Sequence, residues 1–146
     1  MIAIREQALR FLARREYSKA QLRNKLLAKG WDQEQIHAVL EDLASNKLQD
    51  DHRYTAVYIR HRIEAGYGPR RIFAELNKNG VGQFDQALMD ENDPEWIERL
   101  KTVWQKKFKN KIPQDDKTKF QQIRFLLSRG FTPEQVKFLF TMDENQ

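Results

Sequence analysis

Apolar residues recur along this chain three or four positions apart, which is the spacing of one buried face on an α-helix. No segment alternates apolar and polar residues with the period of two that marks a strand, and β-branched residues are sparse. The pattern therefore predicts an all-α protein with nine helices. The predicted apolar faces are, in chain order, Ala8, Leu9, Phe11, Leu12; Leu22, Leu26, Leu27; Ile36, Val39, Leu40, Leu43; Tyr54, Val57, Tyr58, Ile63; Ile72, Phe73, Leu76; Phe84, Ala87, Leu88; Trp96, Ile97, Leu100, Val103, Trp104, Phe108; Phe120, Ile123, Leu126, Leu127; and Val136, Leu139, Phe140.

Residues that stabilise helix starts stand at the borders of these segments. Ser18, Asp32 and Thr132 each precede a glutamine by three positions, which is the arrangement of a capping box. Asp50 and Asp51 are expected to cap the fourth helix in the same way, through a side-chain oxygen. These caps predict helix starts independently of the hydrophobic spacing.

The stretch from Gly66 to Gly80 contains one helix with both ends specified. Gly68 is expected to be the N-cap, and Pro69 suits the first helical position because it lacks an N–H that would be unpaired there. Gly80 is expected to end the helix in the left-handed conformation that glycine tolerates.

The end of this helix recurs twice more. Three glycines stand fifty residues apart, each preceded by a leucine four positions earlier and followed by a large apolar residue: Leu26-Gly30-Trp31, Leu76-Gly80-Val81 and Leu126-Gly130-Phe131. Such periodicity indicates tandem repeats. We predict three three-helix repeats, at residues 1–50, 51–93 and 94–146, in an elongated array whose last four residues fray.

Composition restricts the class of protein. The chain has 146 residues, of which 40% are hydrophobic and 32% charged, and it has no cysteine, which excludes disulfides and thiolate sites. Neither a signal peptide nor an apolar run of the roughly 20 residues that span a bilayer is present, so we expect a cytoplasmic protein. The net charge of +5 suits a nucleic acid or an acidic protein as partner.

No catalytic residue, metal site or cofactor is predicted. The histidines His37, His52 and His61 lie on different predicted helices without carboxylates at ligand spacing. The glycines around Tyr67 resemble a phosphate-binding loop, but no strand precedes them and Pro69 lacks the N–H that a phosphate cradle needs.

Binding is the remaining class of function, and the placement of charges speaks against a helix-turn-helix mode of binding. A helix-turn-helix mode would place the third helix of each repeat in the DNA major groove, but Glu34, Glu41 and Asp42 would meet phosphates there. The cations gather instead on the first two helices of each repeat. They form either a solvated face or a discontinuous basic strip that suits an extended acidic or nucleoprotein partner.

A further alternative involves the lysine-rich segment after residue 103. Trp104 and Phe108, interleaved with Lys106, Lys107, Lys109 and Lys111, could stack bases and hold phosphates. The two aromatic residues also share a stripe with Leu100, which favours a place in the core.

One family combines these features. The chain resembles the RecX family of recombination regulators through the motif Gly-x-Gly-Pro-x-Arg-Ile-x-x-Glu-Leu at residues 66–76, followed by Gly80. Residues 48–62 resemble the family before this motif, residues 12–30 fit its opening repeat, and residues 124–131 fit its closing one. The structural signature comprises Gly30, Asp50, Gly66, Gly68, Pro69, Glu75, Leu76, Gly80 and Gly130.

This resemblance implies a non-enzymatic modulator of RecA recombinase. Family members bind the groove of the RecA–single-stranded-DNA filament and depress filament extension, ATPase, strand exchange and coprotease activities. A monomer is expected, with weak direct contact to single- or double-stranded DNA as an additional feature; a protein that binds nucleic acid directly through its basic face is the alternative. On electrostatic grounds we assign partner contact to Arg14, Arg15, Arg60, Arg62, Arg70, Arg71, Lys106, Lys107, Lys109, Lys111, Arg124 and Arg129.

Overall fold

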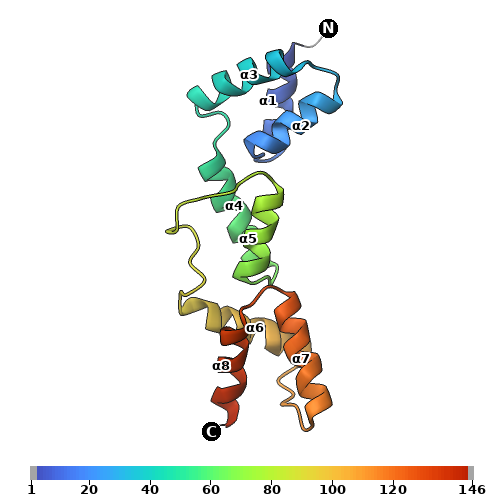
Figure 1. Ribbon diagram of the computed structural model, residues 1–146, viewed down its shortest axis with the longest axis vertical. Coiled ribbons are helices and arrows are strands. Elements are labelled where there is room, and N and C mark those ends of the chain that lie inside the picture. Colours follow the sequence, from blue (N-terminus) through green and yellow to red (C-terminus); the bar gives the residue numbers. More distant parts are fainter. Residues whose placement is uncertain (1–2, 145–146) are drawn as a thin grey trace. The chain divides into compact units, whose positions relative to one another are not determined.

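The computed structural model describes residues 3–144, and every regular element in this range is an α-helix, which confirms the predicted fold class (Figure 1). The helices are α1 (Ile4–Arg14), α2 (Lys19–Ala28), α3 (Gln33–Ser45), α4 (Asp51–Glu64), α5 (Pro69–Lys78), α6 (Glu95–Phe108), α7 (Asp116–Ser128) and α8 (Pro133–Glu144). The last helix enters the tail 143–146 that was expected to fray, and the rest of that tail lies outside the described residues. No helix in the described range combines the length and apolar character needed to cross a bilayer.

The predicted capping boxes are confirmed. The backbone N–H of Gln21 donates to Oγ of Ser18 at 3.1 Å, and the N–H of Ser18 donates to Oε1 of Gln21 at 3.2 Å. The boxes of Asp32 and Thr132 have the same reciprocal bonds. Asp50 caps α4 by accepting from the N–H of Arg53 at 3.1 Å, and this bond lowers the pKa of the carboxyl.

The three repeated glycines end their helices as predicted. Gly30, Gly80 and Gly130 have φ of +95°, +88° and +101°. In each case the N–H of the next residue reaches back to the carbonyl of the leucine four positions before the glycine, at 3.3, 2.9 and 3.4 Å. These are the long bonds of a Schellman motif, so the fifty-residue period of the sequence is also a period of the backbone.

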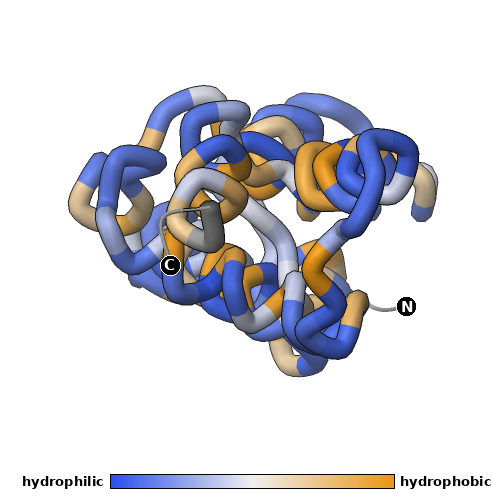
Figure 2. The backbone as a smooth tube through the Cα atoms, turned by 90° about the horizontal axis from the view of Figure 1, so that it is seen from below, coloured by the Kyte–Doolittle hydropathy of each residue, from blue (hydrophilic) through white to orange (hydrophobic). Residues whose placement is uncertain are grey.

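Two compact units make up the described chain. One comprises the residues up to Tyr58 together with Leu76–Asp85, and the other comprises Ile59–Glu75 and the residues from Gln86 onward. In the first unit, α1, α2 and α3 pack around a core that includes Leu22, Leu26 and Leu43. In the second, α6, α7 and α8 pack on one another over Leu100 and Leu126. Figure 2 shows how hydrophobic positions alternate with hydrophilic ones along the helices. The repeat boundaries given above stay a prediction.

The predicted sixth helix, around Phe84, Ala87 and Leu88, is wrong. Residues 79–94 form turns and irregular backbone, so eight helices rather than nine occur in the described range. Three apolar residues over five positions are too few for a stable helix, because a helix this short gains few backbone bonds after its costly first turn.

The apolar faces are also narrower than predicted. Leu27, Phe73, Phe120 and Leu127 are 39%, 45%, 59% and 39% exposed. The buried line of each second helix instead runs through one residue per turn: Leu22 and Leu26, Ile72 and Leu76, and Gln122 and Leu126, all at most 2% exposed.

Successive repeats meet at two equivalent contacts, each inside one compact unit, which we name the first and second repeat joint. In the first joint, Oγ of Ser18 donates to the carbonyl of Asn79 at 2.6 Å, and Gly80 lies against Ala20. In the second, fifty residues later, the N–H of Gly68 donates to the carbonyl of Arg129 at 2.7 Å. The second joint positions the candidate site.

Candidate functional site

The signature motif turns the chain sharply between α4 and α5. Gly66 has φ of +92°, and the N–H of Tyr67 donates to the carbonyl of Arg62 at 3.1 Å, which closes the end of α4. The carbonyl of Gly68 accepts from the N–H of Ile72 at 3.2 Å and so starts α5, as the sequence predicted for an N-cap. Tyr67 therefore lies between the last turn of α4 and the first turn of α5.

Three guanidinium groups surround the ring of Tyr67. The guanidinium carbons of Arg62, Arg71 and Arg129 lie 3.9, 4.3 and 4.8 Å from the ring centroid. They come from α4, from α5 and from the residue that caps the end of α7. Cations within about 6 Å of an aromatic face are attracted to its quadrupole, which offsets part of their mutual repulsion.

A second ring extends this arrangement toward α6. The guanidinium carbon of Arg129 also lies 5.1 Å from the ring centroid of Phe125, and Nζ of Lys107 lies 5.1 Å from the same centroid. Arg129 thus contacts both rings. We call Tyr67, Phe125, Arg62, Arg71, Arg129, Lys107 and their counter-ion Glu75 the Tyr67 cluster.

Glu75 is the carboxylate of this cluster. It accepts from Nε and Nη2 of Arg62 at 2.9 and 2.8 Å, and Nε of Arg71 lies 3.6 Å from it. The side chains of Arg62 and Glu75 are 26% and 24% exposed, so this forked pair is half-buried. Arg62 and Arg71 thus contact the carboxylate, whereas the contacts of Arg129 and Lys107 in the cluster are with rings, so cations outnumber carboxylates among its members. The pair of Arg71 with Glu75 joins neighbours at i, i+4 on α5, whereas the pair of Arg62 with Glu75 joins α4 to α5.

The second repeat joint holds the parts of the cluster together. Besides the bond from Gly68 to Arg129, the N–H of Arg70 donates to the carbonyl of Gly130 at 2.9 Å. A Cβ on Gly130 would lie 2.6 Å from the backbone nitrogen of Arg71, so only glycine permits this approach. The glycines of the signature motif therefore have structural roles that bring the arginines together.

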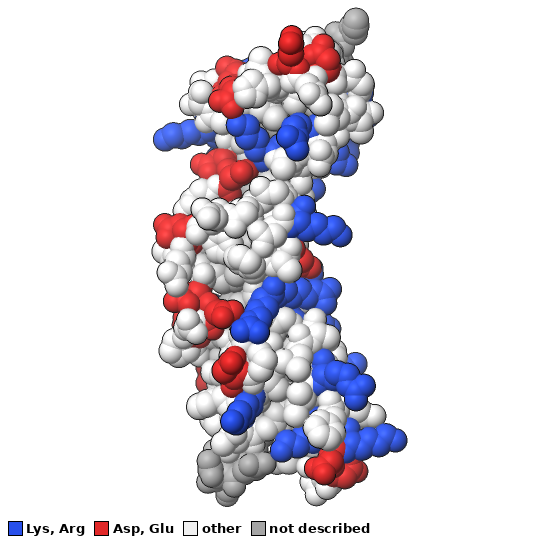
Figure 3. All heavy atoms as spheres, in the orientation of Figure 1, with Lys and Arg blue, Asp and Glu red and all other residues white. Residues whose placement is uncertain are grey.

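The other cations assigned to partner contact fall into two groups. Arg15 lies over the ring of Tyr17 at 3.8 Å, and Arg70 pairs with Glu91 at 3.4 Å. The rest are exposed, and their side chains have no ion pair, hydrogen bond or ring contact within the described residues: Arg14, Arg60, Lys106, Lys109, Lys111 and Arg124. In Figure 3, basic and acidic side chains share the face drawn.

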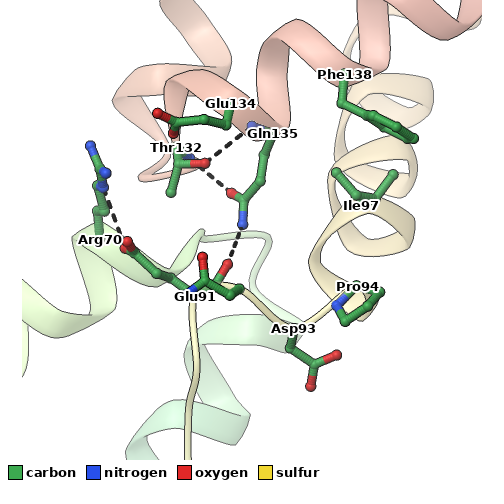
Figure 4. Close-up of a pocket in the computed structure, with 10 residues that line it drawn as sticks. Arg70, Glu91, Asp93, Pro94, Ile97, Thr132, Glu134, Gln135 and Phe138 are labelled. Atoms are coloured by element: carbon green, nitrogen blue, oxygen red, sulfur yellow. Dashed lines mark hydrogen bonds and ion pairs between the residues drawn. The ribbon is translucent and has the colours of Figure 1, made fainter.

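Arg70 borders a different kind of site. Figure 4 shows its guanidinium directed at Glu91, beside a cavity of about 490 Å³ at the start of α8. Nε2 of Gln135 donates to the carbonyl of Glu91 at 2.9 Å and ties the loop to α8. Asp93 and Glu134 also line this cavity, so its charge opposes an anionic ligand.

The base-stacking alternative for Trp104 is wrong. Trp104 is only 6% exposed, and its Nε1–H donates to Oε1 of the buried Gln122 at 2.8 Å. Phe108 packs edge-on against Phe125, with centroids 5.5 Å apart. Both rings belong to the packing of α6 on α7, which is the place that their shared stripe with Leu100 favoured.

The sequence did not predict that the rings of Tyr67 and Phe125 would contact cations. The position of Tyr67 between two signature glycines was the one available sign.

No group of three metal-ligating side chains occurs within the part of the chain that the structure describes. The geometry defines a class of protein built from helical repeats, with a rigid, ring-supported cationic cluster at a repeat joint and exposed cations around it.

Comparison with known proteins identifies the family. Residues 5–43, 50–87 and 93–140 match the first, second and third three-helix domains of RecX. Regulatory protein RecX of Pseudomonas entomophila (strain L48) is 42% identical over 137 residues, which cover 92% of this chain and 88% of the relative. Regulatory protein RecX of Halorhodospira halophila (strain DSM 244 / SL1) is 40% identical over 92% of this chain and 84% of its own length. The chain belongs to the RecX family.

Solved structures agree in fold. The crystal structure of RecX from Lactobacillus salivarius matches with a TM-score of 0.78 at 17% identity, covering 98% of this chain and 96% of that one. A crystal structure of regulatory protein RecX matches with a TM-score of 0.80 at 24% identity, covering 93% of this chain and 70% of that one.

Proposed function

We propose that this protein is a non-enzymatic regulator of RecA recombinase. It binds in the groove of the RecA–single-stranded-DNA filament and inhibits filament extension, ATPase, strand exchange and coprotease activity. It acts as a cytoplasmic monomer in DNA repair and the SOS response.

The observation that carries this proposal is the match to the family over almost its whole length. The three domain matches together span most of the chain, and the relatives that are about 40% identical cover 92% of it. The relatives are named regulatory proteins.

The distribution of charge supports contact through cations. Of the signature residues, Gly68, Pro69, Leu76 and Gly80 are used in helix ends and packing. The exposed lysines and arginines without acidic partners in the described range have no such structural use. By holding adjacent RecA subunits across the groove, these cations would hinder subunit addition or conformational cycling.

The direct test is the single-stranded-DNA-dependent ATPase of the cognate RecA, with this protein titrated from far below stoichiometry. DNA is kept in excess, so that competition for DNA cannot imitate inhibition. A fall in turnover at low ratios is expected, since blocked filament growth affects many subunits at once. Unchanged turnover across the titration would overturn the proposal.

Contact residues are tested by neutralising Arg70 and Arg71 together. Glutamine is preferred to glutamate, because a carboxylate at position 71 would face Glu75 inside the Tyr67 cluster. Arg99→Gln is the matched control, since Arg99 lies over the ring of Trp96 at 4.6 Å and is neutralised by Glu95 at 2.9 Å. Weaker inhibition by the double variant alone is expected; full inhibition would exclude the contact role of both arginines.

A further inference from the structure

We infer that the Tyr67 cluster is a binding site for the phosphodiester backbone of nucleic acid, and that it contacts phosphates without stacking bases. The inference deepens the proposed function, because single-stranded DNA is part of the proposed partner. It identifies which atoms of this chain would contact that strand directly.

The first reason to assign phosphate binding to the Tyr67 cluster is that its cations converge in space. The side-chain charges of Arg62, Arg71 and Arg129 meet over one ring, although they come from positions up to 67 residues apart in the chain. Arg129 also contacts the ring of Phe125, and Lys107 contacts that same ring. The cations therefore form a short continuous run over two neighbouring rings.

The excess of charge favours a polyanion over a single acidic side chain. One guanidinium satisfies one carboxylate in a forked pair, as Arg62 and Glu75 already do within the cluster. Arg129 has no hydrogen bond or ion pair from its side chain to any described residue, and Lys107 is exposed. Successive phosphates along one strand would match this run, because each nucleotide brings one negative charge.

The rings explain why bases are not expected to bind here. Proteins that stack bases present an open aromatic face beside a basic groove. Here the ring of Tyr67 has three guanidinium groups within 5 Å, and Phe125 has Arg129 and Lys107 near it and the edge-on ring of Phe108. Contacts limited to phosphates would be indifferent to base sequence and strongly dependent on salt.

The cluster is also held ready for a ligand. The two backbone bonds of the second repeat joint, from Gly68 to Arg129 and from Arg70 to Gly130, position the arginines before any ligand arrives. A cationic site held in this way loses less side-chain entropy on binding than mobile surface lysines do.

The test measures binding of the full-length protein to a fluorescein-labelled oligothymidylate, without RecA, across a salt series. For Arg129→Gln we expect roughly tenfold weaker binding at low salt, since hydrogen bonds to charged groups are among the stronger ones. The slope of log K against log salt should fall by about 0.7, which corresponds to one single-stranded phosphate contact. Arg99→Gln, which removes a paired arginine from the same compact unit, should leave affinity and slope unchanged.

A second pair of variants tests the role of the ring. Tyr67→Phe is the conservative variant and should retain more affinity than Tyr67→Leu, because it keeps the ring and the hydroxyl has no hydrogen bond within the described residues. Tyr67→Leu removes the surface on which three guanidiniums rest and should lose about tenfold in affinity. Far-UV circular dichroism shows whether each variant is folded, and Arg129→Gln preserves the backbone carbonyl used in the joint.

The outcomes separate this inference from the proposed function. Parental affinity and slope for Arg129→Gln would overturn the inference, and if RecA inhibition were lost in the same variant, the cluster would bind an acidic protein surface instead. A preference for one base over another would also contradict it. Reduced slope in Arg129→Gln, combined with a parent protein that leaves RecA turnover unchanged, would support the inference and refute the proposed function.

Discussion

Replacing Gly130 with alanine tests whether the second repeat joint stabilises the protein. Gly130 has φ of +101°, a conformation that costs an L-residue roughly 1–2 kcal/mol. The new Cβ would also lie 2.6 Å from the nitrogen and 3.0 Å from the Cα of Arg71. Because these are backbone atoms, the joint must open, which adds about 1–3 kcal/mol for overpacking.

Gly66→Ala is the matched control in the same compact unit. Gly66 has φ of +92°, but its nearest neighbour would be Cγ2 of Val103 at an ordinary contact distance of 3.4 Å. Backbone strain alone predicts a loss of about 1–2 kcal/mol there. In Gly130→Ala, weakening of the two backbone bonds adds about 0.5–1.5 kcal/mol each. The difference between the two variants should therefore be at least about 2 kcal/mol.

Urea unfolding followed by circular dichroism measures the difference in free energy of unfolding. Amide hydrogen exchange locates it, because the N–H groups of Gly68 and Arg70 donate across the joint and should lose protection only in Gly130→Ala. Equal midpoints and slopes for the two variants, with the Arg70 amide still protected, would refute the idea that a rigid close approach determines this joint.

Three further measurements follow from the described contacts. Glu75→Gln should cost about 1–2 kcal/mol of stability, as a half-buried charged pair is lost, yet raise affinity for oligothymidylate about two- to fivefold; reduced affinity would contradict the assigned excess charge. The pKa of Asp50 is lowered chiefly by the N–H of Arg53, so its stabilisation is complete above the unfolded pKa of about 3.9 and is lost as pH falls through the lower folded value. Thermal melts should therefore weaken below about pH 4, and less so in Asp50→Asn, which still caps but does not titrate; identical profiles would exclude this contribution. Leu126→Ala should cost about 2–5 kcal/mol and Phe120→Ala under about 1 kcal/mol, since these residues are 0% and 59% exposed; similar losses in urea unfolding would show that Phe120 is part of a core.

Local features of the fold were predictable from the sequence. Capping boxes at Ser18, Asp32 and Thr132 involve residues three positions apart, so their geometry does not depend on the rest of the chain. The left-handed glycines at helix ends are likewise determined by residues close to them in the sequence. The predicted sixth helix fails for the converse reason, because its short apolar pattern carried no cap and no long buried face.

The width of the buried stripe on a helix depends on the neighbouring elements that pack against it. The spacing of hydrophobic residues in the sequence does not contain this information. The repeat nevertheless contains a clue to it. Leu27 and Leu127 align with Asn77, and a polar residue at the equivalent position of the middle repeat indicates an outward-facing site. Gln122, which aligns with the buried Leu22 and Ile72, was missed because its partner, Trp104, comes from another helix.

The candidate site could be predicted only as a set of charges. Arg62, Arg71 and Arg129 belong to separate parts of the chain, and their meeting over Tyr67 depends on a tertiary contact made by Gly68 and Gly130. Neither spacing nor composition encodes this convergence. The sequence-based assignment contained the cations of the cluster together with cations outside it, such as Arg70, which pairs with Glu91.

The repeat joint has a consequence for how such proteins can change in length. Its acceptors are main-chain carbonyls, those of Asn79 and Arg129, while the donor is a hydroxyl in one joint and an amide in the other. Because the acceptor is a main-chain carbonyl, the hydrogen bond does not depend on the identity of the accepting residue's side chain, and nearly every surface side chain can change. Gly30 has the same left-handed backbone, and a Cβ placed on it would have no described atom within 4 Å, so a duplicated fifty-residue period joined ahead of it would find an open docking edge. Growth and loss by whole periods are therefore compatible with this architecture.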